Sequence, residues 1–175
     1  MAKHEAISGS DEWYTPAWIF EALNCGFDMD VAHPGVTAPT IPVTRWCNAT
    51  ISEGSLAQEW RGHVWMNPPF GGRNGYRLWA KKFIEHGNGI ALAPNRTGAP
   101  WWQEFATRCD TLLFVTPKIK FLRPDGSEGK SPGYGSVLMA IGREAQRALE
   151  GAALNRAGLL ASVRDPHAAV MRDAA

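Results

Sequence analysis

The feature that most constrains the fold of this 175-residue chain is a set of short, almost continuously apolar runs, at 64–66, 89–93, 111–115 and 136–141. Runs of this length and composition are typical of strands that are covered on both faces. Segments with apolar residues at helical spacing separate the first three runs. This alternation predicts an α/β fold, with a mostly parallel sheet and helices on both of its faces.

Turn and cap residues mark further elements near the N-terminus. Thr15-Pro16 is typical of a helix start, with Thr15 as the N-cap and Pro16 in the first helical position, and this helix should stop near Gly26. Residues 27–31 alternate between apolar and polar side chains, which indicates a strand. Residues 33–50 are rich in Pro, Thr and Val and are expected to form a loop.

The two ends of the chain are less regular in sequence than its middle. We expect a short strand at 119–121, a loop at 122–134 and a weakly helical or partly disordered extension at 143–175. The polar N-terminus is expected to form a flexible arm at 1–10. These boundaries leave one folded domain at 11–142, because no linker or repeat divides that stretch.

Composition excludes several classes of protein. A formal net charge of +1 argues against a strongly basic protein that coats DNA. Three scattered cysteines favour a reducing compartment and argue against a disulfide scaffold. The spacing of the Cys and His residues predicts no metal site, and neither a signal peptide nor a membrane-spanning run is visible. We therefore expect a cytoplasmic protein.

Residues suited to chemistry concentrate in Asn67-Pro68-Pro69-Phe70, directly after the apolar run at 64–66. The Asn67 side-chain oxygen can accept a hydrogen bond from an amine, and the two prolines make a stiff turn whose carbonyls are acceptors. The Phe70 ring can stack on a planar base. The alternative interpretation is structural, because Pro-Pro after a strand often forms only a rigid exit turn.

Polar or rigid residues stand at the ends of three predicted strands, namely Asp30, Asn67 and Pro94. The carboxyl ends of parallel strands lie along one edge of a sheet, and ligands of such sheets bind beyond that edge. The sequence therefore predicts a ligand site there. For Asp30, the structural alternative is that its side chain caps a turn.

Four segments, in this order and spacing, resemble the phage-type DNA N6-adenine methyltransferase family: Trp13-x-Thr15-Pro16, 27–32, 67–70 and 135–138. The resemblance covers roughly residues 11–142. It implies a Rossmann-like methyltransferase fold, S-adenosylmethionine as the methyl donor and double-stranded DNA as the substrate. The chain departs from broader methyltransferase patterns because no Phe-x-Gly-x-Gly loop follows the first strand, and the Asp30 segment stands in its place.

For catalysis, the resemblance implies roles for all four residues of the Asn-Pro-Pro-Phe motif. The Asn67 side-chain oxygen and the Pro68 carbonyl would accept hydrogen bonds from the N6 amine of the target adenine and make its nitrogen reactive. Pro69 would keep the turn rigid, and Phe70 would stack on the base, which must leave the duplex to reach the site. Transfer would be a direct displacement without a covalent enzyme intermediate.

For the cofactor, the resemblance implies contacts from residues near the first helix and the strand ends: Trp13, Thr15, Pro16, Asp30, Ala32, Glu53 and Asn67. Asp30 would bind an amino or hydroxyl group of the cofactor. Glu53 would touch the cofactor adenine, or would alternatively be a solvated surface acid. Asp11 and Tyr14 are further candidates.

Recognition of DNA is expected to involve basic residues that follow the motif: Arg73, Arg96, Lys118, Lys120 and Arg123. The segment at 118–134 is basic and aromatic, as in a DNA-contacting hairpin, although a solvated edge hairpin guarded by lysines has the same composition. The segment at 71–76 could close over the flipped base or contact the DNA backbone. We interpret Trp101 and Trp102 as core residues, and we expect a monomer without a metal.

Several functions are compatible with this sequence. Transfer to adenine N6 is the leading interpretation, and transfer to cytosine N4 would present the same amine chemistry to Asn67. Transfer to a glutamine amide or to an RNA base is a further alternative. A non-catalytic nucleic-acid-binding module on the same fold belongs to a different class, and the intact motif argues against it. No GxGxxG follows a strand, which argues against a nucleotide-dependent oxidoreductase.

Overall fold

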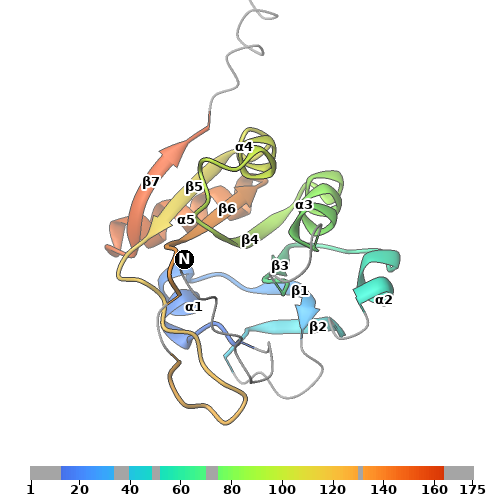
Figure 1. Ribbon diagram of the computed structural model, residues 1–175, viewed down its shortest axis with the longest axis horizontal. Helices are drawn as coiled ribbons and strands as arrows, with labels where there is room; N and C mark the ends of the chain where they lie inside the picture. The colour runs from blue at the N-terminus through green and yellow to red at the C-terminus, as the bar shows by residue number, and fades with distance from the viewer. Residues whose placement is uncertain (1–12, 34–39, 49–51, 70–74, 130–131, 164–175) are drawn as a thin grey trace, which may run out of the picture.

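Seven strands form one mixed sheet, and helices cover both of its faces (Figure 1). The computed structural model describes residues 13–33, 40–48, 52–69, 75–129 and 132–163. In chain order its elements are α1 (Ala17–Leu23), β1 (Phe27–His33), β2 (Val43–Asn48), α2 (Ser52–Ala57), β3 (Val64–Met66), α3 (Gly75–His86), β4 (Gly89–Pro94), α4 (Pro100–Ala106), β5 (Thr111–Val115), β6 (Ser136–Ile141), α5 (Arg143–Leu154) and β7 (Gly158–Ser162).

The strand order β2-β1-β3-β4-β6-β5-β7 divides the sheet into a parallel and an antiparallel half. β1 pairs parallel with β2 and β3, and β3 pairs parallel with β4. β6 runs antiparallel to both β4 and β5, and β7 runs antiparallel to β5. The expectation of a mostly parallel sheet is therefore wrong for the second half. No helix lies between β5 and β6 in the described residues, so β6 can return beside β5 in the opposite direction.

Two apolar clusters confirm that helices pack on both faces of the sheet. One cluster joins α3 and α4 to the sheet through residues such as Phe83 and Phe105. The other joins α1 and α5 to the opposite face through Ile19 and Leu149, and it includes Trp65 of β3. Trp102 is buried in the first cluster and Trp101 packs against it, which confirms that these two residues belong to the core.

The first helix begins differently from the sequence prediction. Its N-cap is Pro16, which makes no side-chain cap hydrogen bond, and helical geometry starts at Ala17. The expected N-cap role of Thr15 is wrong, because the Thr15 hydroxyl accepts a hydrogen bond from the Asn67 side chain. The helix ends at Leu23, and Asn24 takes the left-handed conformation that commonly terminates helices.

β2 lies inside the stretch that we expected to be a loop. It is an edge strand of the sheet, and Val43 pairs with Phe27 at the start of β1. The Thr44 and Arg45 side chains are exposed, so β2 lacks the continuous apolar pattern of the inner strands. Polar residues and a preceding proline are common on edge strands. Because of these features, the sequence pattern did not indicate a strand at β2.

The segment after β5 packs against the N-terminal segment and forms no strand at 119–121. Leu122 instead forms isolated bridges to Tyr14 and Glu128. The backbones of Tyr14 and Leu122 exchange two hydrogen bonds of 2.9 Å. Gly129 lies against Trp13 so closely that a Cβ there would be 2.3 Å from the indole ring. These contacts fix the chain just before α1.

The C-terminal elements are part of the sheet and the core. Ala145 and Leu149 of α5 are fully buried against the face that also carries α1. β7 pairs with β5, so that Leu160 lies beside Leu113. Both elements lie beyond residue 142, where we expected the folded domain to end.

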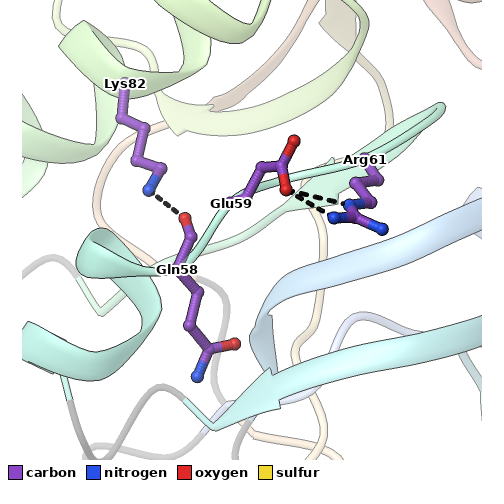
Figure 2. A network of polar contacts seen from close by, with 4 residues as sticks. All are labelled: Gln58, Glu59, Arg61 and Lys82. Atoms are coloured by element: carbon purple, nitrogen blue, oxygen red, sulfur yellow. Dashed lines mark hydrogen bonds and ion pairs between the residues drawn. The ribbon is translucent and has the colours of Figure 1, made fainter.

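A lysine from α3 anchors the loop that leads into β3 (Figure 2). The Lys82 ammonium donates hydrogen bonds to the Gln58 carbonyl and, at 2.5 Å, to the Leu56 carbonyl at the end of α2. It also lies 5.1 Å from the centroid of the Trp60 ring. The neighbouring ion pair between Arg61 and Glu59, at 2.6 Å, is exposed and therefore stabilises little. The lysine contacts hold the start of β3, which carries Asn67 at its other end.

Gly89 is required by the pairing of β3 with β4. Its φ is +153°, and a Cβ there would lie 2.3 Å from the Val64 carbonyl oxygen. We expect Gly89→Ala to lower the free energy of unfolding by about 1–3 kcal/mol, because the two strands must move apart. Urea denaturation measures this change.

The matched control is Gly151→Ala in α5, where a Cβ meets no atom within 4 Å. Alanine favours a helix more than glycine, so this variant should be as stable as the wild type or more stable by up to about 1 kcal/mol. Equal destabilisation by the two substitutions would show that the backbone approach at Gly89 does not limit stability.

Candidate active site

The chain order of the strands reverses between β1 and β3. From β1 the chain crosses to β2 on one side, and it then returns to form β3 on the other side of β1. In open α/β sheets, ligands bind beyond the carboxyl ends of the strands at such a reversal. Asn67 directly follows β3, as predicted, whereas Asp30 is the central residue of β1, because the strand continues to His33 and does not end at Asp30 as we expected. The structure therefore brings these two predicted residues to one place.

The first helix and its preceding segment cover this place from one face of the sheet. Asp30 is in register with Trp65 of β3, and neighbours in register point to the same face of a parallel sheet. Trp65 packs in the cluster that contains α1. The Asn67 amide nitrogen donates a 3.2 Å hydrogen bond to the hydroxyl of Thr15, which precedes α1. Asp30 thus lies on the face of the sheet that carries α1, and Asn67 contacts the segment that precedes this helix.

The bond to Thr15 fixes how the Asn67 amide is presented. Thr15 is 1% exposed, and its carbonyl accepts a 2.8 Å hydrogen bond from the Thr40 hydroxyl. Asn67 itself is only partly buried. Since the amide nitrogen is held by the hydroxyl, the amide oxygen is the atom that can accept a hydrogen bond from a ligand. Pro68, which follows, is buried, and Pro69 is exposed.

Asp30 is an acid in an apolar setting, with 2% of its surface exposed. Burial raises the pKa of its carboxyl from 3.8 to about 7, and the hydrogen bond from the Ala32 N–H, at 3.0 Å, acts in the opposite direction. A ligand that donated a hydrogen bond or brought a positive charge would favour the ionised carboxylate. The site therefore holds a buried acceptor whose charge depends on what binds beside it.

Other predicted cofactor residues have mixed positions. Pro16 is buried at the start of α1, while Trp13 is partly buried against Gly129. The Trp13 ring also lies 5.9 Å from the Arg123 guanidinium. Glu53 lies in the first turn of α2, and its side chain is outside the described residues. Asp11, Phe70 and Arg73 also lie outside the described residues.

The predicted DNA-binding cations after β5 have partners within the protein. The Lys120 ammonium pairs with the Glu128 carboxylate at 3.1 Å, and both side chains are exposed. Arg123 donates to the Glu128 carbonyl at 2.7 Å, and Lys118 donates to the Gly133 carbonyl at 3.4 Å. Of these three acceptors, only the Glu128 carboxylate offsets a cation, because the carbonyl acceptors of Lys118 and Arg123 are neutral, so the geometry of this segment suits a folded edge hairpin as well as a DNA contact.

Arg96 and Tyr134 form an exposed pair at the same edge of the sheet as Asn67. The Arg96 guanidinium lies 4.4 Å from the centroid of the Tyr134 ring, and 52% of Tyr134 is exposed. Arg96 follows β4 and Tyr134 precedes β6, which pair with each other through Pro94 and Ser136.

The sequence interpretation missed Asn95, and it gave Tyr76 both a place in the apolar helix, which is confirmed, and a possible role at the flipped base. Asn95 directly follows β4, as Asn67 directly follows β3, and its side-chain oxygen is buried without a hydrogen-bond partner. The available signal was a polar residue directly after an apolar strand. At the end of β4 we interpreted only Pro94 and not Asn95, which follows it. Tyr76 is a core residue of α3, and its hydroxyl donates to the Leu92 carbonyl at 3.1 Å, so it does not close over a base.

A cleft of about 460 Å³ opens at the opposite end of the sheet, where β1 and β2 begin. It is lined by Phe27, Val43, His63 and Glu144, among others. It lies away from Asn67 and does not belong to the site described above. Within the described ranges, no three His, Cys, Asp or Glu side chains are grouped to hold a metal ion. No helix there is long and apolar enough to cross a membrane.

A model of the DNA N-6-adenine-methyltransferase (Dam) family matches residues 3–163. Because the match spans most of the chain, the protein belongs to this family, and the resemblance to N6-adenine methyltransferases is confirmed. No curated protein and no solved structure matches the chain.

Asp30 predicts an unusual dependence of stability on pH. Between about pH 4 and pH 7 the folded protein retains the Asp30 proton and the unfolded chain has released it. The wild type should therefore lose stability from this group as the pH rises through that window, by at most about 4 kcal/mol. Asp30→Asn cannot ionise and should lack this loss.

The measurement is the free energy of unfolding of both proteins from pH 4 to pH 8. His33, whose pKa is lowered by burial, contributes with the opposite sign, but it is present in both proteins and cancels in the difference. The stability of the variant relative to the wild type should increase with pH. A constant difference across the range would contradict a buried Asp30 carboxyl.

Proposed function

We propose that this protein transfers a methyl group from S-adenosylmethionine to the N6 amine of an adenine that is flipped out of double-stranded DNA. Membership of the N6-adenine methyltransferase family supports the reaction. The observation that carries the proposal is the Asn67 amide, held by the Thr15 hydroxyl at the point where the strand order reverses. It is a fixed acceptor where the sheet is expected to bind its ligands.

We further propose that the sheet is a Rossmann-like methyltransferase fold. Helices on both faces, a parallel half and a strand-order reversal between β1 and β3 support this assignment. The antiparallel β6 and β7 extend the sheet on the side away from Asp30. The assignment implies that cofactor and target meet beyond the carboxyl ends of β1 and β3.

The residues at this edge fit S-adenosylmethionine, which carries an ammonium group and hydroxyl groups as donors. Asp30 is a buried carboxyl whose raised pKa reflects the lack of compensating charge, and a donor from the cofactor would supply a partner. Trp13, Thr15, Pro16, Ala32 and Glu53 are proposed as further contacts. When bound, S-adenosylmethionine supplies an electrophilic methyl group on a cationic sulfur.

Asn67 prepares the target amine in this proposal. Its side-chain oxygen and the Pro68 carbonyl accept the two N–H groups of the adenine N6 amine. These bonds draw the nitrogen lone pair out of conjugation with the ring and direct it toward the methyl group. Thr15 prevents the amide from rotating, and the two prolines hold the carbonyl in place. Phe70 stacks on the flipped base.

DNA is bound by cations around this edge of the sheet. We propose that Arg73, Arg96, Lys118, Lys120 and Arg123 contact phosphates of the DNA. Lys120 should contribute less than the others, because Glu128 already pairs with it. The near-neutral charge of the chain predicts a modest dependence of DNA affinity on salt.

The first test of the mechanism is Asn67→Ala. Loss of the amide oxygen should reduce methyl transfer to duplex DNA by about 100-fold or more, as for the removal of an acceptor or donor that acts in the transition state. Transfer of label from S-adenosylmethionine and nucleoside mass spectrometry measure the product. The matched control is Asn88→Ala, because Asn88 precedes the start of β4 at the opposite edge of the sheet.

Asn88→Ala should retain the methyl-transfer activity of the wild type. Equal activity of Asn67→Ala would show that Asn67 has no role in the reaction. N4-methylcytosine as the product would keep the role of Asn67 and change the substrate.

The second test separates positioning from binding. Thr15→Val has almost the same shape but cannot accept the hydrogen bond from Asn67. We expect kcat to fall by about 10- to 100-fold with little change in the KM for DNA, because the amide loses its orientation. Thr15→Ser keeps the hydroxyl and should retain most of the activity. Equal effects of the valine and serine variants would show that the hydrogen bond has no catalytic role.

A further inference from the structure

Three residues form one group at the ends of β4 and β6, which we call the Asn95 cluster: Asn95 and Tyr134, to which the proposed mechanism gives no role, and Arg96, which it places beside a phosphate. β4 and β6 are antiparallel, so the residue after β4 lies beside the residue before β6. The Asn95 N–H accordingly donates a 2.8 Å hydrogen bond to the Gly135 carbonyl. Arg96 lies over the Tyr134 ring, 4.4 Å from its centroid.

The side chain of Asn95 has no structural explanation in the protein alone. Its oxygen is buried and has no hydrogen-bond partner. A buried acceptor without a donor costs about 1–3 kcal/mol, and native proteins contain few of them. The backbone hydrogen bond to Gly135 would form with any residue except proline at this position. Other buried polar atoms of the described residues, such as Trp65 Nε1 and Trp102 Nε1, also lack a partner, but Asn95 lies at the strand end beside the candidate ligand site, where a donor can arrive with a ligand.

The position of Asn95 indicates that the partner of its side chain is DNA rather than the cofactor. β3 lies between β1, which carries Asp30, and β4. Asn95 is therefore on the opposite side of Asn67 from Asp30, the carboxyl that we propose binds the cofactor. Met66 pairs with Ala91, so Asn67 is level with the next residue of β4 and Asn95 lies three residues beyond it. This is about 10 Å farther out along the strand direction. The duplex from which the adenine leaves must lie on that outer side.

Tyr134 and Arg96 offer a matching surface for a base. The tyrosine is half exposed and its ring carries a guanidinium on one face, which leaves a planar, positively charged surface. Aromatic rings and guanidinium planes stack on nucleobases, and arginine also contacts phosphate.

We propose that Asn95 accepts a hydrogen bond from the amino group of a DNA base next to the flipped adenine, while Tyr134 and Arg96 stack against that base. The inference rests on the proposed function and adds a residue that determines sequence specificity. Adenine is the best match, because an asparagine amide pairs with its N6 and N7 atoms together. Thymine is the poorest match, because it has no amino group.

The test is a binding selection that does not depend on methyl transfer. The wild-type chain, Asn95→Ala and Asn88→Ala are each incubated with a pool of random-sequence DNA duplexes, and the retained duplexes are sequenced. The wild type and the Asn88→Ala control should enrich one neighbour of a retained adenine, with adenine highest and thymine lowest. Asn95→Ala should lose this preference and bind the pool about 3- to 10-fold more weakly.

Stability measurements separate a ligand contact from a structural role. Removal of an unpaired acceptor removes its cost, so Asn95→Ala should unfold at the same or a higher urea concentration than the wild type. Tyr134→Ala should weaken DNA binding in the same way, and Tyr134→Phe should not. Asn95→Ala with unchanged affinity and unchanged base preference would overturn the inference. If the wild type bound DNA but produced no methyladenine, the proposed function would fail and the selection would still decide the role of Asn95.

Discussion

The hydrogen bond between the Asn67 amide and the Thr15 hydroxyl joins the two parts on which the candidate site depends. Asn67 is set by β3, whose entry is held by Lys82 and whose pairing with β4 requires a glycine at position 89. Thr15 is set by α1 and by the bridge between Tyr14 and Leu122. A catalytic amide can act on an amine only if its oxygen keeps one orientation, and this bond provides it.

The buried Asp30 carboxyl lowers the stability of the free protein, and a ligand that supplied a donor would remove this destabilisation. Its carboxyl lies in an apolar environment with a backbone N–H as a donor, so ionisation near neutral pH is unfavourable in the free protein. Asn95 carries a different unfavourable group on the other side of Asn67, a buried oxygen that has no hydrogen-bond donor in the protein. Functional sites commonly keep such unfavourable groups at the expense of stability. The two residues therefore mark the two sides from which we propose that cofactor and DNA approach.

The sequence predicted the inner strands and the helices α1, α3 and α4 because their burial leaves a clear pattern, whereas α2 was not predicted and α5 was expected to be only weakly helical or partly disordered. β3, β4, β5 and β6 are apolar throughout, and α3 shows helical spacing of its buried residues. β2 escaped prediction because an edge strand has one exposed side and tolerates polar residues. The direction of β6 could not be read either, because strand patterns carry no information about which neighbour they pair with.

The candidate site was predictable where a polar residue directly follows an apolar strand, as at Asn67, whereas Asp30 was expected at a strand end and lies in the middle of β1. Thr15 was assigned to the helix cap, because a local rule cannot foresee a partner 52 residues away in the chain. Asn95 was missed for the same reason, since only the folded structure shows that its oxygen is buried and unpaired. Contacts across long sequence separations are the part of the site that local patterns do not contain.

The most direct measurement of the central claim is the identity of the product that the wild-type protein makes from unmethylated duplex DNA and labelled S-adenosylmethionine. Nucleoside mass spectrometry of the digested DNA should find N6-methyladenine and no methylated cytosine. N4-methylcytosine in place of N6-methyladenine would contradict the assigned target. The absence of any label in DNA, with DNA and cofactor both bound, would contradict the account of Asn67 as a catalytic amide.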